Sequence, residues 1–456
     1  MATGPTSPQD VIGDDSDAAL RTAALEEAEG IAPQIEPGTL EMPRVLRALR
    51  NRNFRYFWAG NFLSNIGTWM QSVAQGWLVL ELASQAPPAL FGSVGKRSAF
   101  WLGLVAFAAS APMLAFTLIG GVIADRVDKR RLLIRTQSVM MLSALAMAVL
   151  SFTHRINIPL VVLLAFTTGT AMSLNMPGYQ ALVPSLVPRD DLTNAIALNS
   201  AQFNLSRVLG PTIGGFVMAW WGVPANFLLN ALSFLAVIFA LTQIQYPAQP
   251  QQDDSAGLWQ RLGEGFRYVL ERRQMSSLLL LVALASIFGV PFLMFVPLFA
   301  KDILHVGERG LGLLMACSGA GAFLAATTIA YLGKIKSRGR FVVISASVFF
   351  AAIIAFTFSR QFALSGAMLA IAGYCMILTV ATVNTLLQHL ADDPMRGRVM
   401  SIYATAFLGF APVGSLIAGS LAGALTAPIA IAAMSSLALV GTWSLFLSRP
   451  ELRHLD

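Results

Sequence analysis

Long apolar segments make up most of this chain of 456 residues. A helix needs about 20 apolar residues to cross the hydrocarbon core of a bilayer. Only 12% of the residues are charged, against about a quarter in soluble domains, which is too few to cover a water-soluble surface. The sequence therefore predicts an all-α membrane protein with twelve transmembrane helices, at about 54–82, 98–124, 132–153, 157–183, 194–220, 223–245, 276–301, 309–333, 340–359, 361–390, 399–424 and 426–448.

The basic residues are distributed unevenly between the loops. If the amino terminus is cytoplasmic, 23 of the 31 lysines and arginines fall on the cytoplasmic side and six on the other side. Loops rich in lysine and arginine stay in the cytoplasm, so we expect a multi-pass protein of the cell (inner) membrane with both termini cytoplasmic. The same pattern explains the net charge of +7 without nucleic acid as a partner.

Polar stretches divide the chain. The start is rich in Pro, Gly, Ser and acids and lacks the apolar core of a signal peptide. After the sixth segment, apolar residues between Leu258 and Leu270 share one helical face, which indicates an interfacial helix. Gly210 and Gly215 recur at an offset of 204 as Gly414 and Gly419, which suggests two related halves. We expect a disordered cytosolic tail at 1–43 and a six-helix bundle at 44–245. A linker with an amphipathic helix at 246–275 leads to a second, pseudo-symmetric six-helix bundle at 276–448, and 449–456 form a cytosolic end.

No residue pattern points to catalysis. Cys317 and Cys375 lie inside apolar segments and the four histidines are scattered, so no metal-ligand spacing is present. The sequence shows no nucleophile–base pair and no phosphate-binding loop. We therefore expect a protein that is not an enzyme, with no catalytic residue, metal or cofactor. We also expect a monomer, whose partners are the lipid bilayer and a small-molecule substrate.

A polar stripe runs along the first apolar segment. Its members recur at intervals of four and three residues, so they share one side of a helix. An unbroken polar line is costly against lipid, and we expect it to face a central cavity. Hydrogen bonding between packed helices is the alternative. The stripe consists of Asn61, Asn65, Thr68, Ser72 and Gln75. In the tenth segment, Asn384 and Gln388 are further cavity candidates.

The fifth segment contains a charge at membrane depth. Ser200, Asn204 and Arg207 share one face of the expected helix. A guanidinium at the centre of the bilayer costs ~2.5–3.5 kcal/mol on insertion scales, so Arg207 should face a water-filled cavity or a partner. Two alternatives remain for that partner: an anionic or carbonyl-rich substrate, or a structural bond to helix carbonyls or to Asp125.

Acids and bases are densely mixed between the second and third segments. Such a run can lock neighbouring helix ends through charge-assisted hydrogen bonds, although a basic loop that only sets topology is the simpler alternative. The run resembles the major facilitator superfamily signature G-x-x-x-D-R-x-G-R-[RK], with Asp128 where the superfamily prefers glycine. The resemblance implies a major facilitator fold and a cytoplasmic gate that stabilises the outward-open state, formed by Gly121, Asp125, Arg126, Lys129 and Arg130.

Other runs resemble exporters of that superfamily. Gly210 and Gly214 permit close helix packing, and Pro211 permits a kink in the helix. The three residues look like the antiporter motif of the superfamily, although Ser206 replaces the earlier glycine of that motif. The runs 53–71, 207–211 and 396–401 are similar to the branch of enterobactin exporters and macrolide-efflux-type proteins.

The resemblance implies export of a small organic molecule, siderophore- or drug-like, by proton-coupled alternating access. The fourth segment lacks the arginine that drug–proton antiporters of the superfamily often carry there, since positions 166–170 contain no base. Glu81, at the end of the first segment, is the candidate proton carrier, and the alternative is an interfacial glutamate in contact with water. Two alternative functions remain: uptake of a metabolite by a transporter of the same fold, and a membrane sensor or scaffold that does not transport.

Overall fold

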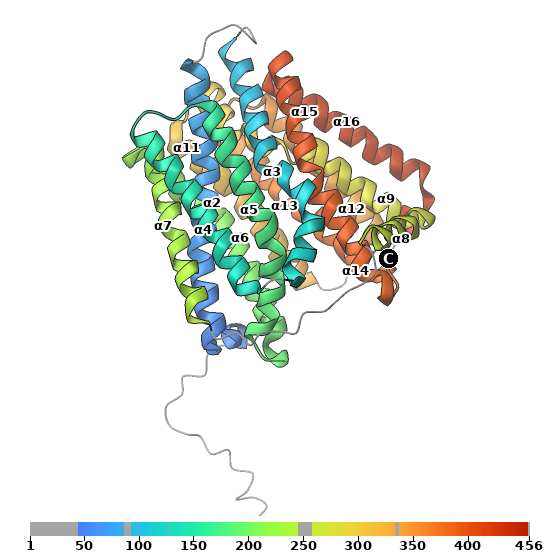
Figure 1. The fold of residues 1–456 in the computed structure, drawn as a ribbon. Coiled ribbons are helices and arrows are strands. Elements are labelled where there is room, and N and C mark those ends of the chain that lie inside the picture. Colours follow the sequence, from blue (N-terminus) through green and yellow to red (C-terminus); the bar gives the residue numbers. More distant parts are fainter. Residues whose placement is uncertain (1–43, 86–92, 127, 245–257, 333–336, 455–456) are drawn as a thin grey trace, which may run out of the picture. The chain divides into compact units, whose positions relative to one another are not determined.

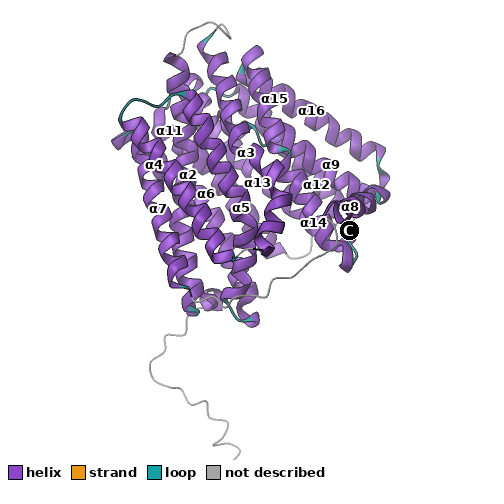
Figure 2. Ribbon diagram, viewed as in Figure 1, coloured by secondary structure: helices purple, strands orange, loops and turns teal. Residues whose placement is uncertain are grey.

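The computed structural model describes residues 44–85, 93–126, 128–244, 258–332 and 337–454. None of these described residues lies in a strand, and helices account for all the long elements (Figure 2). The expectation of an all-α protein is confirmed. The predicted tail at positions 1–43 lies outside the described residues, as does the polar first part of the predicted linker.

The first group of helices ends before the linker. Two long helices of this group, α2 and α6, contain 34 and 30 residues. The turn between α6 and α7 depends on Gly222, whose φ of +80° is disfavoured for residues with a side chain. The elements are η1 (Arg44–Arg50), α2 (Arg52–Gln85), α3 (Val94–Arg126), α4 (Lys129–Phe152), α5 (Ile158–Leu182), η2 (Val183–Leu186), η3 (Arg189–Asp191), α6 (Leu192–Trp221) and α7 (Val223–Gln243).

The second group follows the linker helix α8 (Leu258–Glu271). Two predicted segments of this group, the seventh and the eleventh, are interrupted by π-helical turns. Proline lacks a backbone N–H, and Pro291 and Pro412 follow these turns closely. The elements are α9 (Arg273–Leu284), η4 (Ala285–Gly289), α10 (Phe292–Leu298), η5 (Phe299–Ile303), α11 (Gly307–Leu332), α12 (Arg338–Phe358), α13 (Phe362–Leu390), α14 (Asp393–Ala404), η6 (Thr405–Gly409), α15 (Ala411–Ala424), α16 (Ala427–Ser448) and η7 (Pro450–His454).

Ten helical stretches in the described part of the chain are long and apolar enough to cross a membrane. Helices α2 and α6 are not among the ten, although both exceed the length that a span needs. These are the two helices in which the sequence shows a polar stripe and a buried arginine. Twelve spans therefore remain a prediction, which depends on α2 and α6.

The two groups of helices repeat one packing pattern. In the first group α3 packs on α5, α4 on α5 and α4 on α7 (Figure 1). In the second group the helices at equivalent positions make the same pairs, α11 with α13, α12 with α13 and α12 with α16. The groups meet where α3 packs on α15 and where α6 packs on α11. The chain thus contains two related sets of helices that exchange contacts reciprocally.

The glycine repeat in the sequence marks equivalent contacts. A Cβ at Gly215 would lie 2.8 Å from the Cα of Gly312 in α11, and one at Gly419 would lie 2.6 Å from the Cα of Gly103 in α3. Backbones can approach this closely only where neither residue has a side chain. Both contacts lie toward the end of the bundle where α2 finishes and α3 begins, which we call the α2–α3 side. The opposite end, where α2 begins, is the η1 side.

Candidate substrate-binding site

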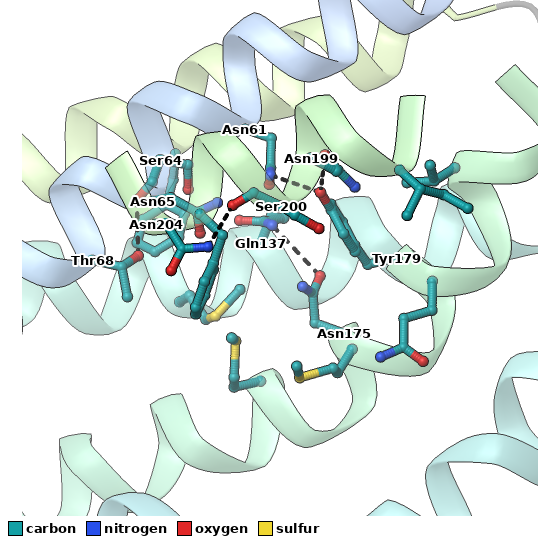
Figure 3. A pocket seen from close by; sticks show the side chains of 18 of the residues that line it. Asn61, Ser64, Asn65, Thr68, Gln137, Asn175, Tyr179, Asn199, Ser200 and Asn204 are labelled. Carbon is teal, nitrogen blue, oxygen red and sulfur yellow. Dashed lines mark hydrogen bonds between the residues drawn. The ribbon is translucent and has the colours of Figure 1, made fainter. Parts of the chain in front are cut away.

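A cavity of about 510 Å³ lies among helices of the first group. This volume is within the range of small-molecule sites. Its wall is formed by α2, α4, α5, η2, α6 and α7, and its lining residues on α2 and α6 come from the first half of each helix, toward the η1 side. The lining residues are Asn61, Ser64, Asn65, Thr68, Gln137, Met140, Met172, Asn175, Met176, Tyr179, Gln180, Val183, Pro184, Ile196, Asn199, Ser200, Phe203, Asn204 and Phe234 (Figure 3).

Five of the ten predicted cavity residues line this pocket: Asn61, Asn65, Thr68, Ser200 and Asn204. The first three are on α2 and the other two on α6. Their spacing of three or four residues turns them to one side of each helix, as the sequence indicates. The polar stripe of α2 therefore contributes to a pocket wall along its first half.

The other predicted residues lie elsewhere. Ser72 is exposed, and its hydroxyl donates to the carbonyl of Trp69 at 2.8 Å. Gln75 is half-buried one turn further along α2. On α13, the Gln388 side-chain amide donates to Asn384 Oδ1 at 2.6 Å in an exposed pair. None of these four residues belongs to the pocket wall, and their role in a cavity stays a prediction.

Tyr179, on α5 in the pocket wall, connects three helices. Its hydroxyl donates to Asn199 Oδ1 on α6 at 2.7 Å and accepts from Asn61 Nδ2 on α2 at 3.1 Å (Figure 3). Its ring lies 5.3 Å from that of Phe57, centroid to centroid. The sequence pattern did not indicate Tyr179 or Asn199 as cavity residues. The available signal was the four-residue spacing between Asn175 and Tyr179, which puts both on one face of α5.

Buried hydrogen bonds link the pocket wall to the surrounding helices. Asn175 Oδ1 accepts a hydrogen bond from the Thr136 hydroxyl of α4 at 2.9 Å. On the neighbouring helices, Asn230 Nδ2 donates to Gln71 Oε1 at 2.6 Å. All four side chains are buried, and a buried amide without a partner is costly. These bonds therefore fix the relative positions of the helices that form the pocket.

The pocket contains no formal charge. Its polar wall consists of amides and hydroxyls, and its apolar wall includes Met140, Met172, Met176, Phe203 and Phe234. An ionised group buried in such a wall would lose its hydration without gaining an opposite charge. Amide and hydroxyl groups can instead donate to and accept from a neutral ligand. The lining is suited to an uncharged part of an amphiphilic molecule.

Arg207 lies one turn beyond Asn204 on α6 but outside the pocket wall. Its side chain is buried, and its guanidinium carbon is 5.8 Å from the centre of the Trp69 ring. Among the residues that the structure describes, Arg207 has no hydrogen-bond acceptor and no acid at ion-pair distance. The structural alternative of a bond to helix carbonyls is therefore not found there, and the side chain of Asp125 lies outside the described set.

The predicted gate is described only in part. Gly121, Asp125 and Arg126 belong to the last turns of α3, but their side chains lie outside the described set. The guanidinium of Arg130 donates to the carbonyl of Thr242 at 2.6 Å and so ties the start of α4 to the end of α7. Lys129 begins α4. The gate at Gly121, Asp125, Arg126, Lys129 and Arg130 stays a prediction.

The glycines of the antiporter-like motif permit close packing. A Cβ at Gly210 would lie 2.8 Å from the Ile66 carbonyl oxygen, and one at Gly214 would lie 3.1 Å from the Met70 Cα. Both contacts are with α2, so these glycines bring the two pocket-lining helices together. Pro211 lies inside α6, between them.

Glu81 lies far from the pocket, near the end of α2. Its carboxylate accepts a hydrogen bond from Trp77 Nε1 at 2.9 Å. The ammonium of Lys301, from the second group, is 5.5 Å from the centre of the Trp77 ring. Lys301 is also close enough to Glu81 for their charges to attract. Glu81 thus belongs to a contact between the two groups on the α2–α3 side.

Other polar contacts join the groups on the same side. Lys96 Nζ, near the start of α3, donates to the Ala424 carbonyl at the end of α15 at 2.8 Å. The guanidinium of Arg309, near the start of α11, lies 5.7 Å from the centre of the Trp220 ring at the end of α6. With the glycine contacts, these side chains hold the groups together on the α2–α3 side, opposite the half of α2 that lines the pocket.

A helical membrane protein with an uncharged pocket beside the junction of two repeated groups has the architecture of a small-molecule transporter. Comparison with family models makes the class specific. The chain belongs to the transmembrane secretion effector family of the major facilitator superfamily, whose model matches residues 45–456. Membership confirms the expected superfamily, and it confirms a multi-pass, non-enzymatic transport protein.

Curated relatives are transporters as well. The chain is similar to the staphyloferrin A transporter of Staphylococcus aureus, at 23% identity over 80% of this chain and 88% of the relative. It is also similar to the enterobactin exporter EntS of Escherichia coli K12, at 25% identity over 78% of this chain and 85% of the relative.

Solved structures share the fold at lower identity. The peptide-transporter-family protein PepTSo superposes with a TM-score of 0.69 at 12% identity, over 89% of this chain and 99% of that protein. A D-xylose–proton symporter superposes with a TM-score of 0.66 at 14% identity, over 87% of this chain and 98% of that protein. A bacterial homologue of the human lysosomal transporter Spinster, in an inward-facing and unoccupied conformation, superposes with a TM-score of 0.66 at 13% identity. The match covers 91% of this chain and 98% of that protein. These matches establish the major facilitator fold.

Proposed function

We propose that this protein exports a small organic molecule by alternating access, using the uncharged pocket as its loading site. The observation that carries the proposal is an asymmetry along the bundle. The pocket lies toward the η1 side, while the contacts between Gly103 and Gly419 and between Gly215 and Gly312 join the groups on the α2–α3 side. This arrangement suits a state that is loaded from one side and closed toward the other.

The proposed direction depends on topology. We propose that α2 and α6 cross the membrane with the ten apolar spans, which gives two six-helix bundles with both termini in the cytoplasm. The excess of lysine and arginine in alternate loops supports this orientation. The η1 side is then cytoplasmic, so substrate enters the pocket from the cytoplasm. Separation of the glycine contacts on the α2–α3 side releases it outside.

The proposed substrate is an amphiphile with several hydrogen-bonding groups, siderophore- or drug-like. Two relatives are named for staphyloferrin A and enterobactin, which supports a substrate of this kind. The pocket adds its own support, since amides and hydroxyls alternate there with methionine and phenylalanine. Methionine adapts its shape easily, which favours a range of related ligands.

Proton coupling is proposed through Glu81. Protonation of this carboxyl group would remove its charge beside Lys301, and so weaken one of the contacts that hold the groups together. A proton entering from the α2–α3 side would then favour separation there. In the same scheme the loop at 121–130 closes the η1 side after separation.

Transport by purified protein in liposomes tests the proposal. Each of several candidate molecules is added with an imposed pH gradient, and its movement is compared for the wild type, Asn65→Leu and Asn204→Leu. Gln361→Leu is the control, because Gln361 is exposed at the start of α13 and makes no capping bond with its side chain. We expect both pocket variants to raise KM about tenfold or more, because a neutral hydrogen bond to a substrate contributes about 1 kcal/mol and its unpaired partner costs more.

The outcomes separate the alternatives. Movement of substrate into the cytoplasmic-side compartment would replace export by uptake. Failure of every molecule to move, with binding retained, would favour a sensor or scaffold. Equal kinetics for the pocket variants and the Gln361→Leu control would show that this pocket is not the loading site.

A further inference from the structure

One buried cation has neither a counter-charge nor a hydrogen-bond acceptor within the described part of the chain. Arg207 is 9% exposed, and within the described part of the chain no acid or carbonyl oxygen pairs with its guanidinium. Arginine stays charged in proteins, and a buried charge normally has a partner. Stabilisation of this one comes from the face of the Trp69 ring, at 5.8 Å.

The position of Arg207 relates it to the pocket. Ser200 and Asn204 line the pocket from α6, and Arg207 is the next residue on that face, one turn toward the α2–α3 side. An aromatic pair connects the two: Phe203, which lines the pocket, contacts Trp69 edge to face with their centroids 6.1 Å apart. Trp69 thus contacts both the guanidinium of Arg207 and a residue of the pocket wall.

The backbone at Arg207 is part of the junction between the two groups of helices. A Cβ at Gly319 of α11 would lie 2.8 Å from the Arg207 carbonyl oxygen and 3.1 Å from the Val208 Cα. Helix α11 therefore packs directly on α6 at this level. A movement that separates α6 from α11 necessarily uncovers the surface beside Arg207.

We propose that Arg207 is a concealed binding station for an oxyanion, such as a carboxylate, reached after the uncharged pocket when α6 and α11 separate. The proposal rests on the proposed function and deepens it, because it assigns the substrate two parts. A neutral, hydrogen-bonding part occupies the pocket, and an anionic group pairs with Arg207 in the next state of the cycle. The planar guanidinium can bind such a group through two parallel hydrogen bonds.

Fluorescence quenching by iodide tests the station without any transport. Iodide is an anion that quenches tryptophan on contact, and Trp69 lies beside Arg207. The signal of Trp69 is obtained as the difference between the full-length wild type and Trp69→Phe in phosphatidylcholine nanodiscs, with iodide replacing chloride at constant ionic strength. Arg207→Gln removes the charge, and Arg207→Lys keeps it. The neutral quencher acrylamide serves as the control for access.

We expect the iodide quenching constant of Trp69 to fall at least twofold in Arg207→Gln and to be largely retained in Arg207→Lys, while acrylamide quenching changes little. Citrate, which does not quench, should compete with iodide in the wild type. Gly312→Leu wedges α11 from α6, since its Cβ would lie 2.7 Å from the Pro211 carbonyl oxygen. This variant should increase iodide quenching in the wild-type background and not in Arg207→Gln.

Three results would overturn the proposal. Equal iodide quenching in the wild type and Arg207→Gln would show that no anion is held there. If Arg207→Gln lowered iodide quenching equally in the Trp69→Phe background, the effect would arise at another tryptophan. Loss of the signal in nanodiscs containing phosphatidylglycerol would assign the station to a lipid phosphate instead of a substrate. Because quenching and transport are measured separately, failure of the pocket variants in liposomes would not affect this test.

Discussion

Replacing Tyr179 with phenylalanine would remove one oxygen atom from the pocket wall and leave the ring in place. That oxygen donates to Asn199 at 2.7 Å and accepts from Asn61 at 3.1 Å. Asn61 is 6% exposed, so water cannot easily replace the lost bond. A neutral hydrogen bond contributes about 0.5–1.5 kcal/mol, and a buried donor left unpaired costs about 1–3 kcal/mol. We expect the substitution to lower the free energy of unfolding by about 2 kcal/mol.

The effect on the ligand follows from the same geometry. If substrate also contacts the Tyr179 hydroxyl, its loss removes about 1 kcal/mol of binding, which is a roughly fivefold increase in Kd. Unfolding and substrate affinity are measured in one detergent for Tyr179→Phe and for Tyr331→Phe. Tyr331 is 92% exposed, so the control makes the same chemical change outside the bundle.

A double-mutant cycle makes the assignment specific. Tyr179→Phe and Asn199→Ala should be non-additive by about 0.5–1.5 kcal/mol, because each removes the same hydrogen bond. Tyr331→Phe and Asn199→Ala should be additive. If the unfolding free energy of Tyr179→Phe equalled that of the Tyr331→Phe control, the hydrogen bonds of Tyr179 to Asn61 and Asn199 would not contribute to stability.

Three other substitutions probe regions outside the pocket. Gly103→Leu should separate the helix groups on the α2–α3 side, measured as a longer distance between spin labels at the ends of α2 and α15, because its Cβ would lie 2.9 Å from a carbonyl oxygen of α15. Asp191→Asn should lower the free energy of unfolding in urea by about 1 kcal/mol, because it removes the 2.8 Å ion pair with the partly exposed Arg47. Glu81→Gln should abolish gradient-driven movement in liposomes and leave equilibrium binding at the pocket unchanged.

Each of these has a matched control or a contrary outcome. Gly95→Leu introduces the same side chain on α3, where nothing lies within 4 Å, and its label distances should equal those of the wild type. Unchanged unfolding of Asp191→Asn would mean that η1 does not stabilise the start of α6 through this pair. Retained gradient-driven movement in Glu81→Gln would exclude that residue as the proton carrier.

Periodicity in the sequence predicted which residues share a face but not where along the face the pocket ends. Asn61, Asn65 and Thr68 line the pocket, whereas Ser72 and Gln75 continue the same stripe beyond it. The 3.6-residue repeat determines direction around the helix axis. The end of the pocket depends instead on how helices that are distant in the sequence pack together, since its wall comes from α2, α4, α5, η2, α6 and α7.

The sequence also did not predict the hydrogen bonds between side chains of different helices. Tyr179 joins Asn61 and Asn199, which lie 118 and 20 residues away along the chain. No local pattern encodes such a triad, because each member is an ordinary polar residue in its own helix. The π-helical turns were missed for a related reason, since Pro291 and Pro412 predict a local disturbance but not its form.

The internal repeat acquires a physical meaning once the contacts are known. Gly215 and Gly419, 204 residues apart, each contact a glycine of the other group, so the repeat preserves the junction on the α2–α3 side. The pocket wall, by contrast, comes from helices of the first group alone. A repeat that conserves the junction but not the pocket suggests a division of roles: the first group recognises the ligand, while the second closes and opens one side of the path. Exchanging pocket residues should then change which molecules are bound, and exchanging junction glycines should change how fast the two states interconvert.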